Sequence, residues 1–332
     1  LVSPSDLILF HARYPYAWRE EIEQTVLARY GKGRRRRAEE RSIVVATQVI
    51  EQSLDLDFDY MVTDMAPVDL LIQRAGRLQR HAREASERPA PLRAATLAIA
   101  LPPIVEGCPD WADDGRIYEP YVLLRTLAAL QGRDVICTPE DTAPLIAAVY
   151  GDEPEPEGAP LPLQRSLATA REEMAQRLRA EVYEAHRRLI ASPDDKAFAR
   201  AHNSMLHEED PRVHETLQAL TRLSPPGVSL VCLHREGGRV VAEPGSGEAV
   251  ALDAPPDDAL TRVLVRRIVS VTHRGVLATL QDQPAPAAWE RHPLLRHCRL
   301  ALFIDGVYRP PESPYALRLT RGLGLQIIKE AP

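Results

Sequence analysis

Residues 42–81 read SIVVATQVIEQSLDLDFDYMVTDMAPVDLLIQRAGRLQRH. The run Ile43–Thr47 is mostly β-branched and does not alternate with polar residues, which predicts a strand buried on both faces, as in a parallel sheet. Asp59–Thr63 predicts a second strand of this kind. Pro67 favours the start of a helix, which we expect over Val68–Leu78. This stretch therefore predicts part of an α/β fold.

The predicted helix carries Arg74, Arg77 and Arg80 at three-residue intervals. Arg77 and Arg80 would share one face of the helix, and Gln73 would lie one turn before Arg77. Such arginines can form a solvated face or hold carboxylates. They can also stabilise the charge that develops on a phosphoryl group during cleavage, because the guanidinium fork donates several bonds at fixed angles.

On either side of this stretch, strands alternate with helices. We expect a strand over Leu7–His11, a helix over Tyr16–Tyr30 and a further strand over Ala95–Leu101. Two more helices are predicted, around Glu119–Leu130 and Pro139–Tyr150. This alternation indicates a doubly wound layer, that is, a parallel sheet flanked by helices.

The chain then changes character twice. Residues 151–162 are proline-spaced and acidic, which is typical of a linker, and Leu163–Ser192 predicts a long amphipathic helix. Its apolar side would carry Met174, Leu178, Val182 and Leu189. The polar tract at 202–215 is expected to be mobile.

From Val228 the sequence predicts a small α+β domain. VSLVCLHREGGRVVAEP indicates two strands around a Gly-Gly turn, DALTRVLVRRIVSV indicates a helix, and RLALFIDGVY and ALRLTRGLGLQII indicate strands. We therefore expect three parts: an α/β domain over 1–150, a linker with a long helix over 151–210, and an accessory C-terminal domain over 211–332.

Composition restricts the class of protein only broadly. The formal net charge is −6, and Lys32, Lys196 and Lys329 are the only lysines, so arginine abundance by itself indicates codon usage rather than phosphate binding. No apolar run is long enough for a membrane helix. The four cysteines form no C-x-x-C pair. We expect a cytoplasmic protein without a membrane partner.

The segment QRAGRLQRH at 73–81 resembles motif VI of superfamily 2 helicases, and VATQVIEQSLDLDFD at 45–59 resembles their motif V. Together with DMAP and DLLI between them, they resemble the type I CRISPR-associated helicase–nuclease family. FHARYPYAWREEIE, YEPYVLLRTLAAL and PEDTAPLIAAVYG are similar to the same family. Ser53 stands where many other helicases have glycine, which favours this narrower assignment. The resemblance extends over most of 7–150 and implies a second RecA-like helicase domain that lacks its first strand.

The resemblance also implies a set of site residues. The residues expected to be catalytic are Arg77, Arg80 and Gln73. Those expected to bind nucleotide are Asp55, Gln73, Arg77 and Arg80. Those expected to contact DNA are Thr47, Gln48, His11 and Arg13. The hydroxyl and amide of Thr47 and Gln48 follow a strand's carboxyl end, where open α/β sheets bind ligands.

Several of these positions have a second interpretation. His11 and Arg13 could instead have a core or surface role. Glu51 and Asp57 could be structural, tied to Arg74 or to neighbouring loops. The arginine run at 34–37 could contact single-stranded DNA, but a solvated surface loop is the favoured interpretation.

The family implies ATP as the cofactor and single-stranded DNA, the displaced strand of an R-loop, as a partner, together with an RNA-guided CRISPR surveillance complex. The whole would be an ATP-dependent translocase or helicase–nuclease that degrades foreign DNA. No G-x-x-x-x-G-K-[ST] occurs, the Asp152-Glu153 pair lies in the linker, and no His-Asp pair is present.

From these absences we expect a C-terminal portion whose partners include a missing first motor domain, which mainly holds the Mg²⁺, and a missing nuclease domain with its own divalent metal. The chain contributes no metal site, and by itself it would neither hydrolyse ATP nor cut DNA. Two alternatives are another superfamily 2 DNA or RNA helicase and a non-catalytic docking module.

Overall fold

The computed structural model describes residues 3, 6–33, 41–51, 54–111, 114–152, 161–187, 227–247 and 249–330. The arginine run at 34–37, Ser53, the linker at 153–160 and the polar tract at 202–215 lie outside the described residues. The chain divides into two compact units. The first unit comprises Leu1–Met61, Gly76–Thr96 and Pro225–Pro332, and the second comprises Val62–Ala75 and Leu97–Ser224. This grouping differs from the predicted ranges 1–150, 151–210 and 211–332, which stay a prediction as domain boundaries.

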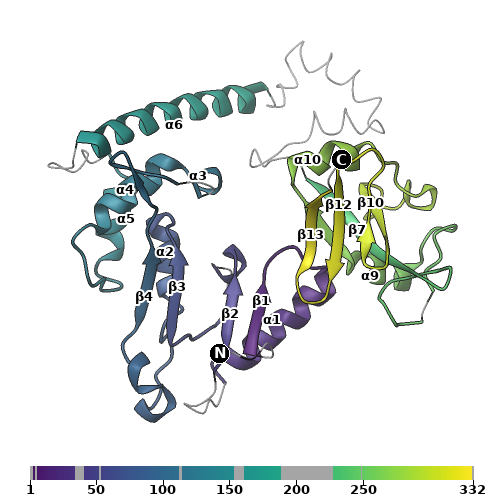
Figure 1. Cartoon of the computed structure of the whole chain (residues 1–332), viewed down its shortest axis with the longest axis horizontal. Coiled ribbons are helices and arrows are strands. Elements are labelled where there is room, and N and C mark those ends of the chain that lie inside the picture. Colours follow the sequence, from purple (N-terminus) through teal and green to yellow (C-terminus); the bar gives the residue numbers. More distant parts are fainter. Residues whose placement is uncertain are drawn as a thin grey trace, which may run out of the picture. The chain divides into compact units, whose positions relative to one another are not determined.

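The first unit begins with β1 (Leu7–Phe10), α1 (Tyr16–Tyr30) and β2 (Ile43–Ala46), seen in purple in Figure 1. The two strands are parallel, with Leu7 opposite Ile43. The bounds predicted for α1 are confirmed, and Val26 and Tyr30, which lie one helical turn apart, are both buried.

Strand β2 differs from its prediction in burial. Ile43 is 43% exposed and Val45 is 50% exposed, so one face of the strand is open rather than packed. In the described chain, β1 and β2 pair only with each other, and β3 (Tyr60–Asp64) pairs with β4 (Thr96–Ala100). The predicted single sheet is therefore found as two separate two-stranded pairs among the described residues.

The C-terminal part of the first unit is a seven-stranded mixed sheet in the order β13-β12-β11-β10-β7-β8, with β9 pairing β7. Strands β10 and β7 are parallel, and the other pairs are antiparallel. The strands and helices are β7 (Val228–Glu236), β8 (Arg239–Val241), α9 (Asp258–Val265), β9 (Ile268–Val271), α10 (Arg274–Gln281), β10 (Cys298–Ile304), β11 (Val307–Tyr308), β12 (Tyr315–Thr320) and β13 (Gly324–Lys329). The predicted strands of this domain are confirmed.

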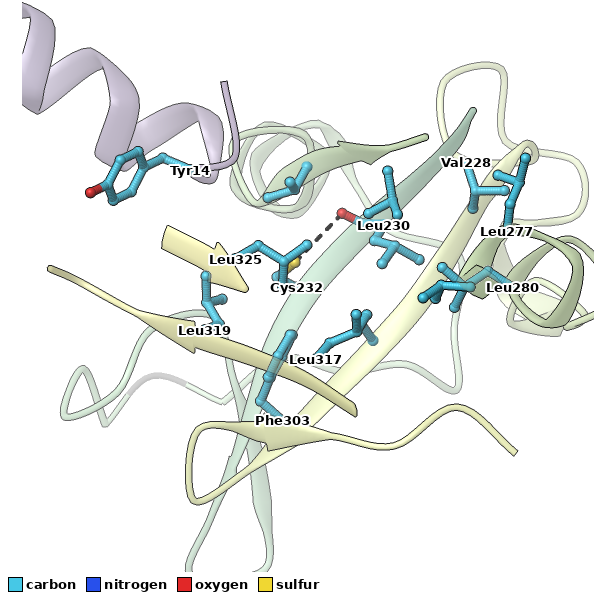
Figure 2. Packing of buried hydrophobic residues seen from close by; sticks show 14 of the residues in the cluster. Tyr14, Val228, Leu230, Cys232, Leu277, Leu280, Phe303, Leu317, Leu319 and Leu325 are labelled. Carbon is cyan, nitrogen blue, oxygen red and sulfur yellow. Dashed lines mark hydrogen bonds between the residues drawn. The ribbon is translucent and has the colours of Figure 1, made fainter. Parts of the chain in front are cut away.

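The central strand β7 is buried on both faces, because successive side chains point to opposite sides of a strand. Leu230 and Cys232 join one core, with α10 and the β12–β13 hairpin (Figure 2). Val231 and Leu233 join a second core with Trp289. A strand that packs on both faces explains the continuous apolar run in its sequence.

One predicted helix in this domain is wrong in its second half. Helix α9 ends at Val265, and Ile268–Val271 forms β9 instead. The helix begins at a cap, where the Asp257 Oδ1 accepts a hydrogen bond from the Leu260 amide at 2.8 Å. Val269 and Val271 alternate into the core beside β7, which selects strand over helix for this β-branched segment.

The core on the α10 side of the sheet also contains residues from the beginning of the chain. Tyr14 and Trp18 are each only 2% exposed and belong to the same cluster as Leu319 and Leu325. Figure 2 shows the Tyr14 ring close to this hairpin. The C-terminal sheet thus shares its core with the start of α1.

The second unit is built mainly of helices. Its elements are the greater part of β3 and β4, α2 (Val68–Ala75), β5 (Ile104–Val105), β6 (Cys108–Pro109), α3 (Asp114–Ile117), α4 (Pro120–Leu130), α5 (Thr142–Tyr150) and α6 (Leu161–Arg187). Helix α4 is central, because Leu123 packs with α2, and Leu124 packs with Leu167 of α6. Helix α5 begins at Thr142 rather than at Pro139, because the Asp141 carboxylate accepts the Cys137 amide in a turn at 2.7 Å.

The long helix is confirmed over its described length, but its predicted apolar face packs only at the beginning. Leu167, Ala170 and Met174 contact α4, whereas Leu178 is 57% exposed and Val182 is 48% exposed. No helix among the described residues is both long and apolar enough to cross a membrane.

Candidate functional site

The site in the first unit forms where residues 54–59 meet residues 77–81. Helix α2 ends at Ala75, and a turn at residues 76–77 leads to Leu78, which forms an isolated bridge with Phe58. The Phe58 amide donates to the Arg77 carbonyl at 2.8 Å, and the Gln79 amide donates to the Phe58 carbonyl at 2.9 Å. This backbone ladder places the acids of the first segment beside the basic residues of the second.

Asp55 is the acid at the exposed end of this site. Its Oδ1 lies 3.1 Å from Arg80 Nε and 3.1 Å from His81 Nε2. The side chains of Asp55 and Arg80 are 50% and 47% exposed. An ion pair this exposed exchanges partners at little cost, so Arg80 is available to another anion.

Arg77 is buried and points into the neighbouring loop. It is 8% exposed, and its guanidinium donates to the carbonyl of Leu54 and, at 3.5 Å, to that of Glu51. Burial lowers the pKa of Arg77, and the positive charge of Arg80 lowers it further, against the opposing charge of Asp55. Arg77 therefore ties the backbone of Leu54 and Glu51 to the segment that carries the exposed Arg80.

The predicted helical face of arginines is wrong, because α2 stops before Arg77. Gln73 remains on α2, exposed, in the second unit. Arg74 is also on α2, where it donates to Thr63 Oγ1 at 2.6 Å and to the Tyr118 hydroxyl at 3.0 Å. The three arginines thus have three different surroundings.

Asp57 takes the structural role that the sequence left open, and its partners come from the segment after α2 rather than from Arg74. Its side chain is buried and accepts hydrogen bonds from Arg83 and, at 3.0 Å, from Arg88. Burial alone would raise the pKa of Asp57, but the bonds and charges of these two arginines outweigh it, and the pKa lies below its usual value. Arg88 also bonds Asp59 at 2.7 Å.

Sequence reasoning missed His81, Arg83 and Arg88 as members of this site. The alternation of Asp55, Asp57 and Asp59 with apolar residues could have signalled an extended segment with its acids on one side. Such a segment needs cations opposite its acids. It does not reveal which of the many arginines supply them.

The four residues predicted to contact DNA lie at one edge of the β1–β2 pair. His11 and Arg13 follow β1, and Thr47 and Gln48 follow β2. Because the strands are parallel, their carboxyl ends meet at the same edge, and the Thr47 amide donates to the Phe10 carbonyl at 3.3 Å. Arg13, Thr47 and Gln48 are exposed there.

His11 fixes the loop that follows β1. Its ring stacks on Tyr14 with centroids 4.6 Å apart, and its Nδ1 accepts the Arg13 amide at 3.0 Å. Burial and the charge of Arg13 lower the pKa of His11, against a hydrogen bond to the Leu323 backbone. The imidazole is therefore neutral near pH 7, and Arg13 carries the positive charge of this loop.

We find no candidate metal site in the described part of the chain. No three His, Cys, Asp or Glu side chains there lie close enough together to hold an ion. The site is thus an arrangement of guanidinium, carboxylate and imidazole groups beside an edge rich in hydroxyl, amide and cationic groups.

Comparison with known proteins identifies the family. Residues 2–83 match the family described as CRISPR-associated nuclease/helicase Cas3, C-terminal, and residues 222–325 match the Cas3 C-terminal domain. The CRISPR-associated endonuclease/helicase Cas3 of Thermus thermophilus is 36% identical over 96% of this chain. The chain belongs to the Cas3 family.

The match is to the C-terminal portion of Cas3, and the chain spans about a third of its relatives' length: 34% of the Thermus thermophilus protein. A crystal structure of a CRISPR-associated protein superposes with a TM-score of 0.85 at 39% identity, over 98% of this chain and 35% of the other. Both family models of the Cas3 C-terminal region match this chain, and its mixed α/β fold agrees with the solved relatives.

Two further Cas3-related structures bear on ligands and partners. T. fusca Cas3 with ATP superposes with a TM-score of 0.70 at 28% identity, over 97% of this chain and 35% of that one. A chain from a CRISPR RNA-guided surveillance complex in a pre-nicking state superposes with a TM-score of 0.68 at 28% identity, over 97% of this chain and 37% of the other.

Proposed function

We propose that this chain is the C-terminal part of an ATP-dependent single-stranded DNA translocase, a helicase–nuclease that degrades foreign DNA in type I CRISPR interference. Residues around β1, β2 and α2 would form its second RecA-like motor domain, and the seven-stranded sheet its accessory C-terminal domain. The long helix α6 would belong to the linker between them. Family membership and the ATP-containing T. fusca relative support this assignment.

The observation that carries the proposal is the Asp55–Arg80 pair supported by buried Arg77. ATP, when bound, supplies a phosphoryl group on which negative charge increases during cleavage. Arg80 is exposed and would exchange its carboxylate partner for that charge, while Arg77 holds the adjoining loop in place. Within the first unit, Asp55, Arg77 and Arg80 are the residues that would hold the nucleotide, and the role of Gln73 stays a prediction from the sequence.

The charge and exposure of Arg80 and Asp55 make this site suitable for a nucleotide. A guanidinium that is half exposed and, among the described residues, pairs with an equally exposed carboxylate is suited to an anionic ligand. The described residues provide no cluster for a metal. We infer that Mg²⁺ is held mainly by the first motor domain, and that the nuclease's divalent metal is held by the nuclease domain. Both domains would lie outside the region that this chain covers.

The edge formed by His11, Arg13, Thr47 and Gln48 would track the DNA backbone. Hydroxyl, amide and guanidinium groups beside strand ends bind phosphate oxygens without reading base sequence. The partners would be the displaced single strand of an R-loop and an RNA-guided surveillance complex. The similarity to a chain from such a complex supports the second of these partners.

ATP turnover tests the proposal in a protein that joins this chain to the nuclease and first motor domains of its relatives. Arg80→Ala should lower DNA-stimulated phosphate release by roughly 10³-fold, the scale for arginine fingers. Arg80→Lys should restore little, because an ammonium cannot reproduce the planar fork.

Arg309→Ala is the matched control. Arg309 is likewise exposed and paired with an acid, Glu330, at 3.0 Å, but it lies in the C-terminal sheet region away from the proposed site. This control should keep full turnover. Near-normal turnover in a folded Arg80→Ala protein would overturn the nucleotide assignment and favour a docking role for this chain.

A further inference from the structure

The turn between β12 and β13 lies against the loop that follows β1. The Tyr14 hydroxyl donates to the Gly322 carbonyl at 2.8 Å, and the Leu325 amide donates to the Arg13 carbonyl at 2.7 Å. These bonds join positions about three hundred residues apart in the chain. The C-terminal sheet therefore contacts the loop directly, through backbone as well as side chain.

Gly324 is the residue that makes this approach possible. Its φ is +63°, in the left-handed region that other residues adopt at a cost. A Cβ at this position would lie 2.5 Å from the Arg13 carbonyl oxygen and 3.0 Å from Cε1 of His11. Both backbone conformation and space thus require glycine.

The turn is also anchored on its other side. Arg321 lies 4.5 Å above the Trp18 ring and pairs with Glu21 at 2.5 Å, and it bonds Glu243, which also accepts the Trp18 Nε1 hydrogen at 3.0 Å. Trp18 is buried at the start of α1. The turn therefore cannot shift without breaking contacts to the element that follows the loop.

These contacts fix the main chain of Arg13 at both of its polar groups. Its amide is bound by His11 Nδ1 and its carbonyl by the Leu325 amide, while its side chain is exposed. Fixing the backbone in advance lowers the ordering cost of binding a ligand through that side chain.

We propose that the 321–324 turn is a positioning element for DNA binding, which holds Arg13 for contact with a backbone phosphate, and that Gly324 is its specific requirement. This inference rests on the proposed DNA edge. It assigns to the C-terminal sheet a role in the motor's DNA contact that does not require the sheet itself to touch DNA.

The test uses Gly324→Ala, with Gly322→Ala as the matched control. Gly322 lies in the same turn, but a Cβ there would meet no atom within 4 Å. Binding of a fluorescent oligothymidine to the 332-residue chain is measured by anisotropy between 0.05 and 0.2 M salt, after thermal unfolding has confirmed that each variant folds.

Gly324→Ala should weaken binding about fivefold at 0.1 M salt and reduce the slope of log K against log salt by about 0.7, the effect of one phosphate contact on a single strand. Gly322→Ala should match the original chain. In an Arg13→Ala background, Gly324→Ala should have no further effect, because both changes remove one contact. Tyr14→Phe, which keeps the backbone intact, should show a smaller loss in the same direction.

Unchanged binding by folded Gly324→Ala overturns the proposal, and so does an additive loss in the Arg13→Ala background, because a general structural effect would add. Equal binding by the original chain and Arg13→Ala overturns it too, since Arg13 would then contact no phosphate. That last result leaves the nucleotide assignment to be judged separately by the turnover of Arg80→Ala.

Discussion

Asp55 and Asp57 are two residues apart, yet one pairs with an arginine in solvent and the other with two arginines in the protein interior. Asp55 lies 3.1 Å from Arg80 Nε with half of its side chain exposed. Asp57 has a fully buried side chain bonded by Arg83 and Arg88. The same residue type thus supports the candidate chemistry at one position and the fold at the other.

This contrast predicts opposite outcomes for one substitution at two positions. Asp57→Asn should lower the free energy of unfolding by about 3–5 kcal/mol, because it leaves two arginine side chains without their buried counter-charge. Asp55→Asn, its matched control, should change it by less than about 1 kcal/mol, since an exposed ion pair contributes little. Urea unfolding measures both. Equal stability of the two variants would contradict the burial assigned to Asp57.

Arg77 and Arg80 should differ in stability even though both are assigned to the nucleotide site. Arg77→Ala should cost about 1.5–3 kcal/mol, because the carbonyls of Leu54 and Glu51 lose a charged donor. Arg80→Ala should cost less than about 1 kcal/mol. Chemical unfolding of both variants measures the difference, and an Arg77→Ala protein as stable as Arg80→Ala would contradict it.

His234 should make the chain less stable in mild acid. It is 4% exposed on β7, and burial, together with the nearby charge of Arg267, lowers its pKa from 6.5 to about 4, against the charge of Glu236. Between these values the unfolded chain binds the proton and the folded chain does not, so stability is present above pH 6.5 and falls as the pH approaches 4.

From pH 7 to pH 5 this residue should account for a loss of about 2 kcal/mol. Urea unfolding of the original chain and of His234→Gln at both pH values isolates the effect, because the other titrating groups are common to the two proteins. The glutamine variant should lose less stability over this interval. Parallel losses in the two proteins would show that His234 is not buried as a neutral group.

Short-range features were predictable from the sequence. The bounds of α1 follow from its apolar periodicity, and the strands of the C-terminal sheet other than β9 follow from apolar runs around glycine turns. The resemblance to helicase motifs correctly indicated the family. Each of these depends on neighbours within one element or on a contiguous motif, and the sequence contains that information directly.

Long-range pairing was decided only by the tertiary structure. Nothing near Asp57 identifies Arg83 and Arg88 as its partners, because any of several arginines has the same chemistry until folding sets the distances. The end of α2 at Ala75 likewise depends on the ladder between Phe58 and the 77–79 segment, which competes with helical hydrogen bonds. Trp18 joins a core made by residues more than two hundred positions later, where burial of its ring outweighs any local preference.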